Sequence, residues 1–392
     1  MSISSVPTRQ ELLSRVSELV PLFQQHAAWQ EENRRLHEET VEALADAGVF
    51  RLRTPTRYGG YEANTRTLID VATEIGRGDG STAWTAAVSW IPTWMVCLFP
   101  DQVQDEVFAN PDVRVCGTLS PSGMAAPVTG GVVVNGKWGF ITGAWHSHWQ
   151  EIIAIRMGPG EPTPIMALVS MSEMRIIDDW HTTGLRGSGS VSTVATDLFI
   201  PAERVLPLDA VLHQRSASHL NTDSEIYRPP LVPVAAASSV GVATGLANAA
   251  REAFFQRLPN RKITYTDYPS QREAPITHLQ VAEAVMQVDQ AEFHASHLGS
   301  LVDRKGTDGS PWTIEERVRA RADMGAACRC AKRAVDILAT ASGASSIYNQ
   351  VPIQRIQRDI QALSLHALMH PDNNAELYGR VLCGLEPNSR YL

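Results

Sequence analysis

Helical spacing of apolar residues dominates the first hundred residues of the chain. The run Thr8-Arg9-Gln10-Glu11 has the form of a capping box, and apolar residues follow it at intervals of three and four as far as Val20. A second helix is predicted over 31–47, with Gly48 as its C-terminal stop. Residues 1–112 are therefore predicted to form an α-helical domain.

The apolar period changes to two after residue 112. Short β-rich runs at 131–134 and 137–141 are separated by Asn135-Gly136. Asn-Gly between two such runs is a strong signal for a two-residue hairpin turn. We therefore predict a β domain over 113–227, with a hairpin turn at Asn135-Gly136.

Long alanine-rich segments with helical spacing return after residue 227. Gly and Pro lie mainly at the ends of these segments, where helices begin and end. The four predicted helices cover 232–258, 272–303, 311–343 and 352–384. They predict an antiparallel four-helix bundle over 228–392. An α domain, a β domain and an α bundle in this order define an α+β fold.

Charge and composition exclude two classes of partner. The 392 residues include 34 basic and 42 acidic side chains, a net charge of −8, so no basic field favours nucleic acid or an anionic membrane surface. No segment is expected to reach the about 18 uncharged apolar residues that a membrane span requires. Five scattered cysteines favour a reducing compartment over a disulfide framework. We expect a cytoplasmic protein.

Common cofactor and metal motifs are absent from the sequence. There is no G-x-G-x-x-G after a predicted strand, no G-x-x-x-x-G-K-[ST], no H-E-x-x-H and no paired C-x-x-C. The sequence therefore carries no signal for a Rossmann unit, a P-loop or a common zinc site. We expect no metal centre and no nicotinamide site in this chain.

Five segments resemble motifs of a known superfamily. They read R-Y-G-G at 57–60, K-W-G-F-I-T-G-A at 137–144, G-L-R-G-S-G-S at 184–190, F-I-P-A-E-R-V at 199–205 and R-I-Q-R-D at 355–359. In sequence and order they are similar to the acyl-CoA dehydrogenase superfamily over nearly the whole chain. The resemblance implies an N-terminal α-helical domain, a central β-barrel or β-sandwich domain and a C-terminal four-helix bundle.

The segment from His366 to Asp372 distinguishes the branches of this superfamily. True dehydrogenases commonly carry a catalytic carboxylate in a Y-E-G-T-like segment hereabouts, and this chain has none. The segment instead resembles the oxygenase components of two-component flavin-dependent monooxygenases, the group that contains 4-hydroxyphenylacetate hydroxylase and dibenzothiophene monooxygenase. The resemblance implies hydroxylation of a small aromatic molecule by O2 and reduced flavin, FADH2 or FMNH2, through a C4a-hydroperoxyflavin. Because a nicotinamide site is missing, a separate NAD(P)H:flavin reductase would supply the reduced flavin.

The same resemblance implies roles for individual side chains. His366 would be the acid or base beside the flavin, because the pKa of histidine lies close to working pH, with His370 as the second choice. Ser120 would lie beside both flavin and substrate. The residues expected to contact the flavin are Thr118, Ser120, Trp138, Thr142, Gly143, Ser188, Ser190 and Arg261. Arg261 would reach the flavin across a subunit interface, which implies a homo-oligomer, with a tetramer expected.

Tryptophans are concentrated in one part of the sequence. Six of the nine lie between residues 84 and 149, and their flat apolar rings can wall a pocket and stack on planar ligands. We expect Trp90, Trp94 and Trp145 to contact the substrate. Phenol-specific relatives often place a histidine near 89–94, and its absence here favours a fused-ring or indole-like substrate. An acyl-CoA dehydrogenase, an amino-sugar N-oxygenase and a non-catalytic flavin-binding protein stay open as alternatives.

Overall fold

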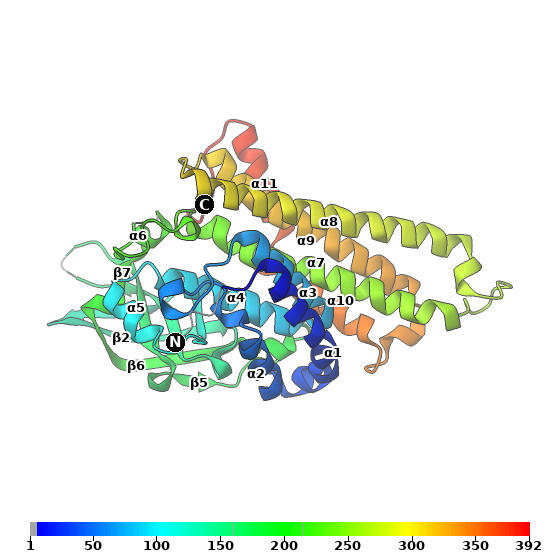
Figure 1. The fold of residues 1–392 in the computed structure, drawn as a ribbon, viewed down its shortest axis with the longest axis horizontal. Coiled ribbons are helices and arrows are strands. Elements are labelled where there is room, and N and C mark those ends of the chain that lie inside the picture. The colour runs from blue at the N-terminus through cyan, green and yellow to red at the C-terminus, as the bar shows by residue number, and fades with distance from the viewer. Residues whose placement is uncertain (1–5, 159, 214) are drawn as a thin grey trace.

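The computed structural model describes residues 6–158, 160–213 and 215–392. Helices come first, a sheet follows and a helical bundle completes the chain, so the predicted α+β order is confirmed (Figure 1). The sheet lies at one end of the molecule, and the bundle extends away from it. The N-terminal helices are α1 (Arg9–Asn33), α2 (Glu38–Asp46), α3 (Thr65–Gly78), α4 (Gly80–Val96) and α5 (Asp101–Val107).

The N-terminal helices begin as predicted but divide at a different place. Thr8 caps α1 through a complete capping box, which confirms the predicted start. The predicted second helix over 31–47 begins too early, because α1 continues past residue 31 and the His37 ring caps α2. Gly48 follows α2 with φ of 80°, the left-handed conformation that favours glycine at a helix stop.

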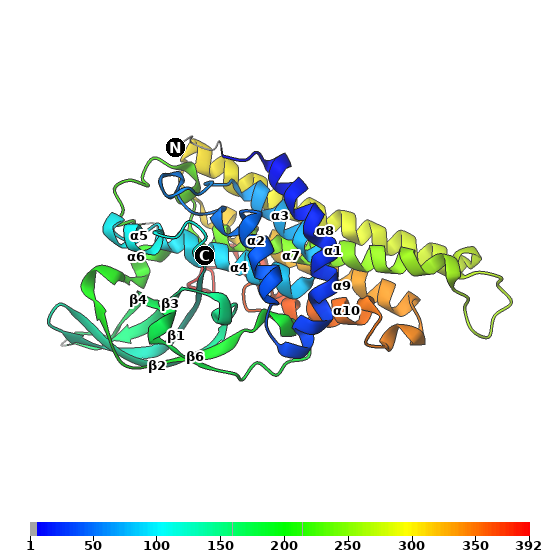
Figure 2. The same ribbon diagram turned by 60° about the horizontal axis from the view of Figure 1, so that its bottom comes forward.

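Seven strands form one mixed sheet in the order β5-β6-β2-β1-β3-β4-β7. β1 pairs with β3 in parallel, and the other neighbouring strands are antiparallel. Figure 2 shows α4 and α5 lying above the sheet. The strands are β1 (Val115–Val128), β2 (Gly131–Ile141), β3 (Trp149–Arg156), β4 (Thr163–Ser170), β5 (Arg175–Ile177), β6 (Val191–Pro201) and β7 (Val205–Pro207).

Strands β1 and β2 form a hairpin with its turn at 129–130. Gly130 adopts φ of 81° in this turn. Asn135 and Gly136 lie inside β2, so the prediction of a turn there is wrong. A Cβ on Gly136 would lie 2.7 Å from the Cα of Gly123 on β1. Glycine is therefore needed at this position by the close approach of two strands and not by a turn.

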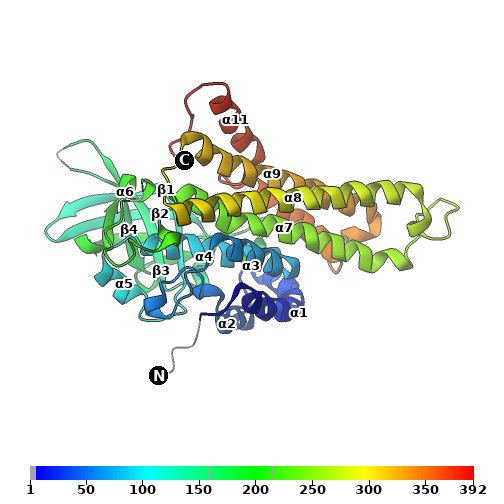
Figure 3. The ribbon, with the colours of Figure 1, turned by 45° about the horizontal axis from the view of Figure 1, so that its top comes forward.

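Three long helices and one shorter helix form the C-terminal bundle, and further short helices lie beside it. Figure 3 shows α7, α8 and α9 side by side along the long axis. The predicted fourth helix over 352–384 is interrupted at 365–370, because Pro371 lacks a backbone N–H and disfavours helical geometry in the residue before it. The helices are α6 (Leu208–Leu212), α7 (Leu231–Arg257), α8 (Pro275–Asp308), α9 (Ile314–Ala341), α10 (Pro352–Ser364) and α11 (Pro371–Leu382).

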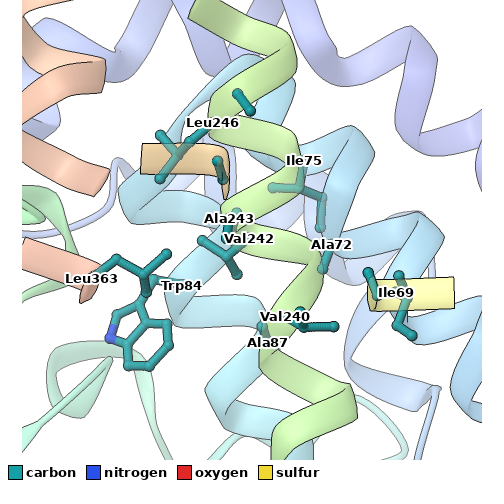
Figure 4. Packing of buried hydrophobic residues seen from close by; sticks show 14 of the residues in the cluster. Ile69, Ala72, Ile75, Trp84, Ala87, Val240, Val242, Ala243, Leu246 and Leu363 are labelled. Atoms are coloured by element: carbon teal, nitrogen blue, oxygen red, sulfur yellow. The ribbon is translucent and has the colours of Figure 1, made fainter. Parts of the chain in front are cut away.

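Helix α7 lies at the centre of the helical core. It crosses α3 closely, since a Cβ on Gly245 would lie 2.8 Å from the Cα of Gly76. Figure 4 shows Leu246 of α7, Trp84 of α4 and Leu363 of α10 in the same packed cluster. The N-terminal helices and the bundle therefore share one apolar core, which fixes α4 and α10 relative to each other.

Helix α7 also corrects one expectation from the sequence. Within the described part of the chain, Leu231–Asn260 is long and apolar enough to cross a bilayer by length and composition alone, with a mean hydropathy of 1.4 in its most apolar window. Small uncharged serines and threonines interrupt the apolar residues, so a strict count of apolar residues overlooks it. The window is 100% buried inside the protein, as expected for a helix that is apolar on all its sides and lies in the core of a large protein.

Candidate active site

A cavity of about 500 Å³ lies between the sheet and the helices. β1 and β2 line one side, which we call the β wall. α4, α7, α9 and the connection 365–370 line the other side, the helical wall. Small-molecule sites have volumes of about 300–1,000 Å³, so this cavity is large enough for an organic ligand. A second cavity of about 110 Å³ beside Asp79 and Asp359 is too small for a fused ring system.

The β wall presents three hydroxyl groups to the cavity, from Thr118, Ser120 and Thr142. Thr142 Oγ1 is 2.7 Å from Ser190 Oγ, which is 2.7 Å from Ser188 Oγ. Ser188 and Ser190 are buried behind Thr142 and are not among the lining residues. This chain of hydroxyls fixes the orientation of the Thr142 side chain.

A change of register in β2 decides which aromatic side chain faces the cavity. Trp138 is fully buried and donates from Nε1 to the carbonyl of Ile153 at 2.9 Å, so it is not at the cavity where a flavin contact was expected. The pairing of β2 with β6 shifts after Trp138, and Phe140 adopts φ of 61°. Phe140 is 75% exposed and lines the cavity. Sequence reasoning missed it, although it lies two residues before Thr142.

The turn after β2 holds two further expected site residues. Gly143 has φ of 72° and donates its N–H to the carbonyl of Ser188 at 3.0 Å. Trp145 packs against Gly189, because a Cβ added to Gly189 would lie only 3.0 Å from the Trp145 ring. Neither residue lines the cavity. Gly143 therefore shapes the turn behind Thr142, and Trp145 lies outside the lining of the cavity where its substrate contact was expected.

The helical wall places His366 against Trp84. Their rings meet edge to face with centroids 4.9 Å apart. His366 faces the open cavity, but the protein packed around it disfavours the imidazolium and lowers the pKa of His366 to about 4. The ring is therefore neutral at working pH, against the expectation of an unperturbed pKa. Because Nδ1 accepts the N–H of Leu368 at 3.3 Å, Nε2 carries the proton of the neutral ring.

His370 does not share a helical face with His366. It is the N-cap of α11, and its Nδ1 accepts the N–H of Asn373 at 3.4 Å. His366 lies in the preceding connection, and His370 is not among the residues that line the cavity. The assumption of one continuous helix through both residues is wrong, and capping accounts for His370.

The expected substrate tryptophans of α4 point away from the cavity. Trp90 is fully buried and donates from Nε1 to the carbonyl of Val49 at 2.8 Å. Trp94 is also fully buried and donates to the carbonyl of Ile226 at 2.7 Å. Each indole N–H has a backbone partner in a different part of the chain, which fixes the side chain in the core. Trp84 is the α4 tryptophan that lines the cavity.

Arg261 lies at the tip of the bundle, after α7. Its Nε donates to Gln271 at 3.1 Å and its Nη1 to Ser345 at 2.9 Å. Arg261 is not among the cavity-lining residues of its own chain. Contact with a flavin would therefore require the cavity of another subunit.

The C-terminal segment supplies lining residues that sequence reasoning missed. Ser389 and Tyr391 border the cavity, and the hydroxyl of Tyr391 donates to the carbonyl of Leu119 on β1 at 3.1 Å. Arg321 of α9 lines the cavity beside them. No motif of the sequence pointed to these residues, because the fold brings them to β1 from the far end of the chain.

One cluster outside the cavity has metal-type ligands. His26, His37 and Glu39 bring one ligand atom each within 4.8 Å of one another. The two rings stack at 4.0 Å, and His26 Nδ1 is 3.0 Å from the hydroxyl of Thr40. These contacts account for the His26 ring without an ion.

The donor set of the cavity suits reduced flavin. Apolar side chains such as Ile91, Met95 and Phe140 offer contact to the faces of a planar ring, and the three hydroxyls offer partners to its polar edges. No Asp or Glu is among the described residues that line the cavity. A carboxylate base of the kind that a dehydrogenase uses is therefore missing from the lining.

Comparisons with known proteins identify the family of this chain. Residues 9–111 match the acyl-CoA dehydrogenase N-terminal domain, and residues 237–371 match the C-terminal domain. The chain is 31% identical to a pigment production hydroxylase of Rhodococcus sp. (strain ATCC 21145), over 95% of this chain and 96% of that protein. It is 30% identical to the flavin-dependent monooxygenase oxygenase subunit HsaA of Mycobacterium tuberculosis, over 96% of both.

A solved structure has the same fold over the whole chain. XiaF from Streptomyces sp., in complex with FADH2 and glycerol, superposes with a TM-score of 0.94 and 29% identity, and the match covers 98% of each chain. The two family matches, the two relatives and this structure all lead to one assignment. The chain belongs to the oxygenase components of flavin-dependent monooxygenases, on the acyl-CoA dehydrogenase fold.

Proposed function

We propose that this protein hydroxylates a fused-ring or indole-like aromatic molecule, held in the cavity between the β wall and the helical wall. The observation that supports this most is the convergence of three hydroxyls with His366 and Trp84 around one largely apolar space. The flat side of Trp84 suits a planar substrate. The described lining also lacks a histidine on α4 beside the substrate region, so a substrate that needs no deprotonation fits best.

We assign the flavin ring to the β wall. Bound reduced flavin, FADH2 or FMNH2, supplies the electrons that activate O2 for the transfer of one oxygen atom. Thr118, Ser120 and Thr142 offer hydroxyl groups to its polar edges. Ser188 and Ser190 support this contact from behind by orienting Thr142.

We assign to His366 the role of a neutral hydrogen-bond donor. Its Nε2 holds the proton, because Nδ1 is occupied by the N–H of Leu368. From the helical wall it donates to an oxygen atom bound in the cavity, and Trp84 keeps the ring in place. A neutral donor aimed at that oxygen atom stabilises the negative charge that develops on it and keeps its own proton.

Isotope labelling tests the proposed reaction. The protein, reduced FAD and indole are mixed under 18O2, and the products are analysed by mass spectrometry. We expect hydroxylated indole with one 18O atom per molecule. Hydrogen peroxide with no labelled organic product, for indole and for a panel of larger fused-ring aromatics, would contradict the proposal.

We also propose that the protein is a homo-oligomer, most simply a tetramer. Helix α8 carries exposed apolar side chains at helical spacing on one face, and monomers rarely leave such a stripe uncovered. An interface on this side of the bundle also fits the position of Arg261 at its tip, outside the cavity of its own chain. The exposed residues are Ile276, Leu279, Met286 and Phe293, at 56%, 73%, 57% and 63%.

Charge on the α8 stripe tests the assembly. Leu279→Arg combined with Phe293→Arg should dissociate the oligomer, because buried unpaired arginines are costly at an apolar interface. Sedimentation velocity measures the mass of the particle. Glu18→Arg on the exposed face of α1 is the control and should leave the mass unchanged. A monomeric wild-type protein at micromolar concentration would contradict the proposal.

We infer a separate NAD(P)H:flavin reductase and a cytoplasmic location as the setting of this reaction. Relatives of this chain are named oxygenase subunit or oxygenase component, which implies a second protein. All five cysteines are free, which suits a reducing compartment.

A further inference from the structure

Arg321 is a buried cation in the wall of the cavity. It lies on α9, only 7% of its surface is exposed, and it is one of the lining residues. Nε donates to Asn374 Oδ1 at 2.9 Å, and Nη1 donates to the carbonyl of Tyr391 at 2.8 Å and to Ser389 Oγ at 3.3 Å. All three acceptors are neutral, so they satisfy hydrogen bonds without balancing the charge.

No acidic side chain of the described chain pairs with Arg321. Burial lowers the pKa of Arg321, and no carboxylate is near enough to raise it. Arg319 on the same helix, by contrast, pairs with Asp323 at 2.9 Å. Glu151 packs beside Gly117 of the lining, but burial raises the pKa of Glu151 well above its usual range and disfavours its charge, and it makes no ion pair with Arg321. A buried charge without a counter-charge is costly, and an anionic ligand would remove that cost.

The guanidinium is held in a fixed position relative to His366. Asn374 accepts from Arg321 and donates from Nδ2 to the carbonyl of Leu368 at 2.8 Å. The N–H of Leu368 is in turn the donor to His366 Nδ1. No acceptor for Nη2 of Arg321 is found within the described residues, so this N–H₂ group is free to bind a ligand oxygen.

We propose that Arg321 binds a carboxylate group of the aromatic substrate, so that the enzyme is specific for an aromatic acid. This inference rests on the proposed function, because it concerns the substrate of the same cavity. A carboxylate bound at Nη2 compensates the charge and anchors one end of the substrate. Ser389 accepts from Nη1 and donates its own hydroxyl proton to the carbonyl of Tyr391 at 3.4 Å, so Nη2 of Arg321 is the donor that the anion would contact.

Two other roles of Arg321 are tested beside this one. Arg321 could bind a phosphate of the flavin, which has the same anionic oxygen chemistry, or it could have a purely structural role. In the structural reading Arg321 only ties the C-terminal segment to α9, and the charge of a ligand makes no difference. In the phosphate reading the arginine favours FMN over riboflavin. The substrate reading alone gives a preference for aromatic acids that is independent of flavin.

Matched pairs of acid and amide test the wild-type protein. Indole-3-acetate and indole-3-acetamide, and benzoate and benzamide, have nearly equal shape and differ in charge. Calorimetry or competitive displacement gives the dissociation constants. In at least one pair we expect the acid to bind about tenfold or more tightly, since hydrogen bonds to charged groups contribute more than neutral ones. Acids that bind no better than amides in both pairs would overturn the proposal.

Variants of two arginines on α9 assign the preference to one side chain. Arg321→Gln should abolish the preference for the acid, and Arg321→Lys should keep part of it. Arg317→Gln is the control, because Arg317 lies one turn earlier, donates to the carbonyl of Leu392 and does not line the cavity. Circular dichroism confirms that each variant is folded. A preference that survives in folded Arg321→Gln, or loss of FMN binding relative to riboflavin in that variant, would overturn the proposal. Hydroxylation of neutral indole by the wild-type protein, without a preference for the acid, separates failure of this inference from failure of the proposed function.

Discussion

The two walls of the cavity are built in opposite ways. On the β wall, Thr142 belongs to a chain of hydroxyls through Ser190 and Ser188, behind a hydrogen-bonded strand pair. On the helical wall, His366 lies in a break between α10 and α11, held by one backbone N–H and the ring of Trp84. The β wall is rigid because neighbouring strands fix it, whereas the helical wall depends on a few contacts to an irregular segment.

This difference separates two tasks. A ring that must be held in one plane is best bound by a surface that does not move, which the sheet supplies. A side chain aimed at the ligand needs an orientation that a regular helix does not offer, and a break in the helix supplies it. We therefore expect changes on the helical wall to affect the reaction and changes on the β wall to affect binding of the flavin.

The largest effect is expected on the helical wall, at His366. His366→Ala removes the one ring donor that we assign to the bound oxygen, so product formed per O2 consumed should fall about 100-fold or more. Simultaneous measurement of O2 uptake, hydrogen peroxide and product gives this ratio. The affinity for flavin, measured by fluorescence, should change little.

His370→Ala is the matched control, because His370 lies four residues after His366 in the same connection but does not line the cavity. It removes the N-cap of α11, so it should cost about 1 kcal/mol of stability while product per O2 stays close to the wild-type value. Equal losses of product in both variants would show that the two histidines act through the shape of the 365–370 connection.

A buried carboxyl connects α10 to the loop before Ser188, and it gives the next effect. Asp359 of α10 accepts the N–H of Leu185 at 2.6 Å, in the loop that leads to Ser188. Burial first, and then the charge of Asp79, raise the pKa of Asp359 to about 7. Burial also raises the pKa of Asp79, but the charge of Arg355 and the hydrogen bonds from Thr82 oppose this rise.

The stability of the protein should therefore depend on pH through Asp359. The pKa of Asp359 is higher in the folded protein than in the unfolded chain, so the folded state holds its proton more tightly. The resulting contribution to the free energy of unfolding is fully present below the unfolded pKa of about 4 and is lost as the pH rises through about 7. Asp359→Asn keeps an acceptor for Leu185 but does not titrate. We expect it to exceed the wild type by on the order of 2–4 kcal/mol above about pH 8, with the gap closing near pH 4.

Urea unfolding at several pH values measures this gap. Asp372→Asn is the control, since Asp372 is largely exposed and pairs with Arg329 at the surface; its profile should follow that of the wild type. A gap between Asp359→Asn and the wild type that does not change with pH would contradict a neutral Asp359.

The two walls also differ in how far the sequence predicts them. Thr118, Ser120 and Thr142 were found from short local motifs, and a strand keeps such residues on one face. Trp90 and Trp94 were misplaced because their orientation is set by carbonyl acceptors distant in the chain, at Val49 and Ile226.

The break at 365–370 shows a further limit of sequence reasoning. The apolar period continues from 352 to 384, so only Pro371 signals the interruption. Arg321 carries no signal at all, because an arginine within a long helix is usually solvated. Its burial follows from the return of the C-terminal segment to β1 through Tyr391.

The smallest effect is expected on the β wall, at Thr142. Thr142→Val keeps the shape but removes the hydroxyl, so flavin affinity should fall about threefold to tenfold, the usual range for one neutral hydrogen bond. Thr142→Ser should restore most of it. Thr193→Val is the control, because Thr193 is buried on the neighbouring β6 with a hydroxyl that has no partner among the described residues. If Thr142→Val instead left flavin binding unchanged and lowered product per O2, the β wall would act in the reaction, and the division of tasks between the two walls would be wrong.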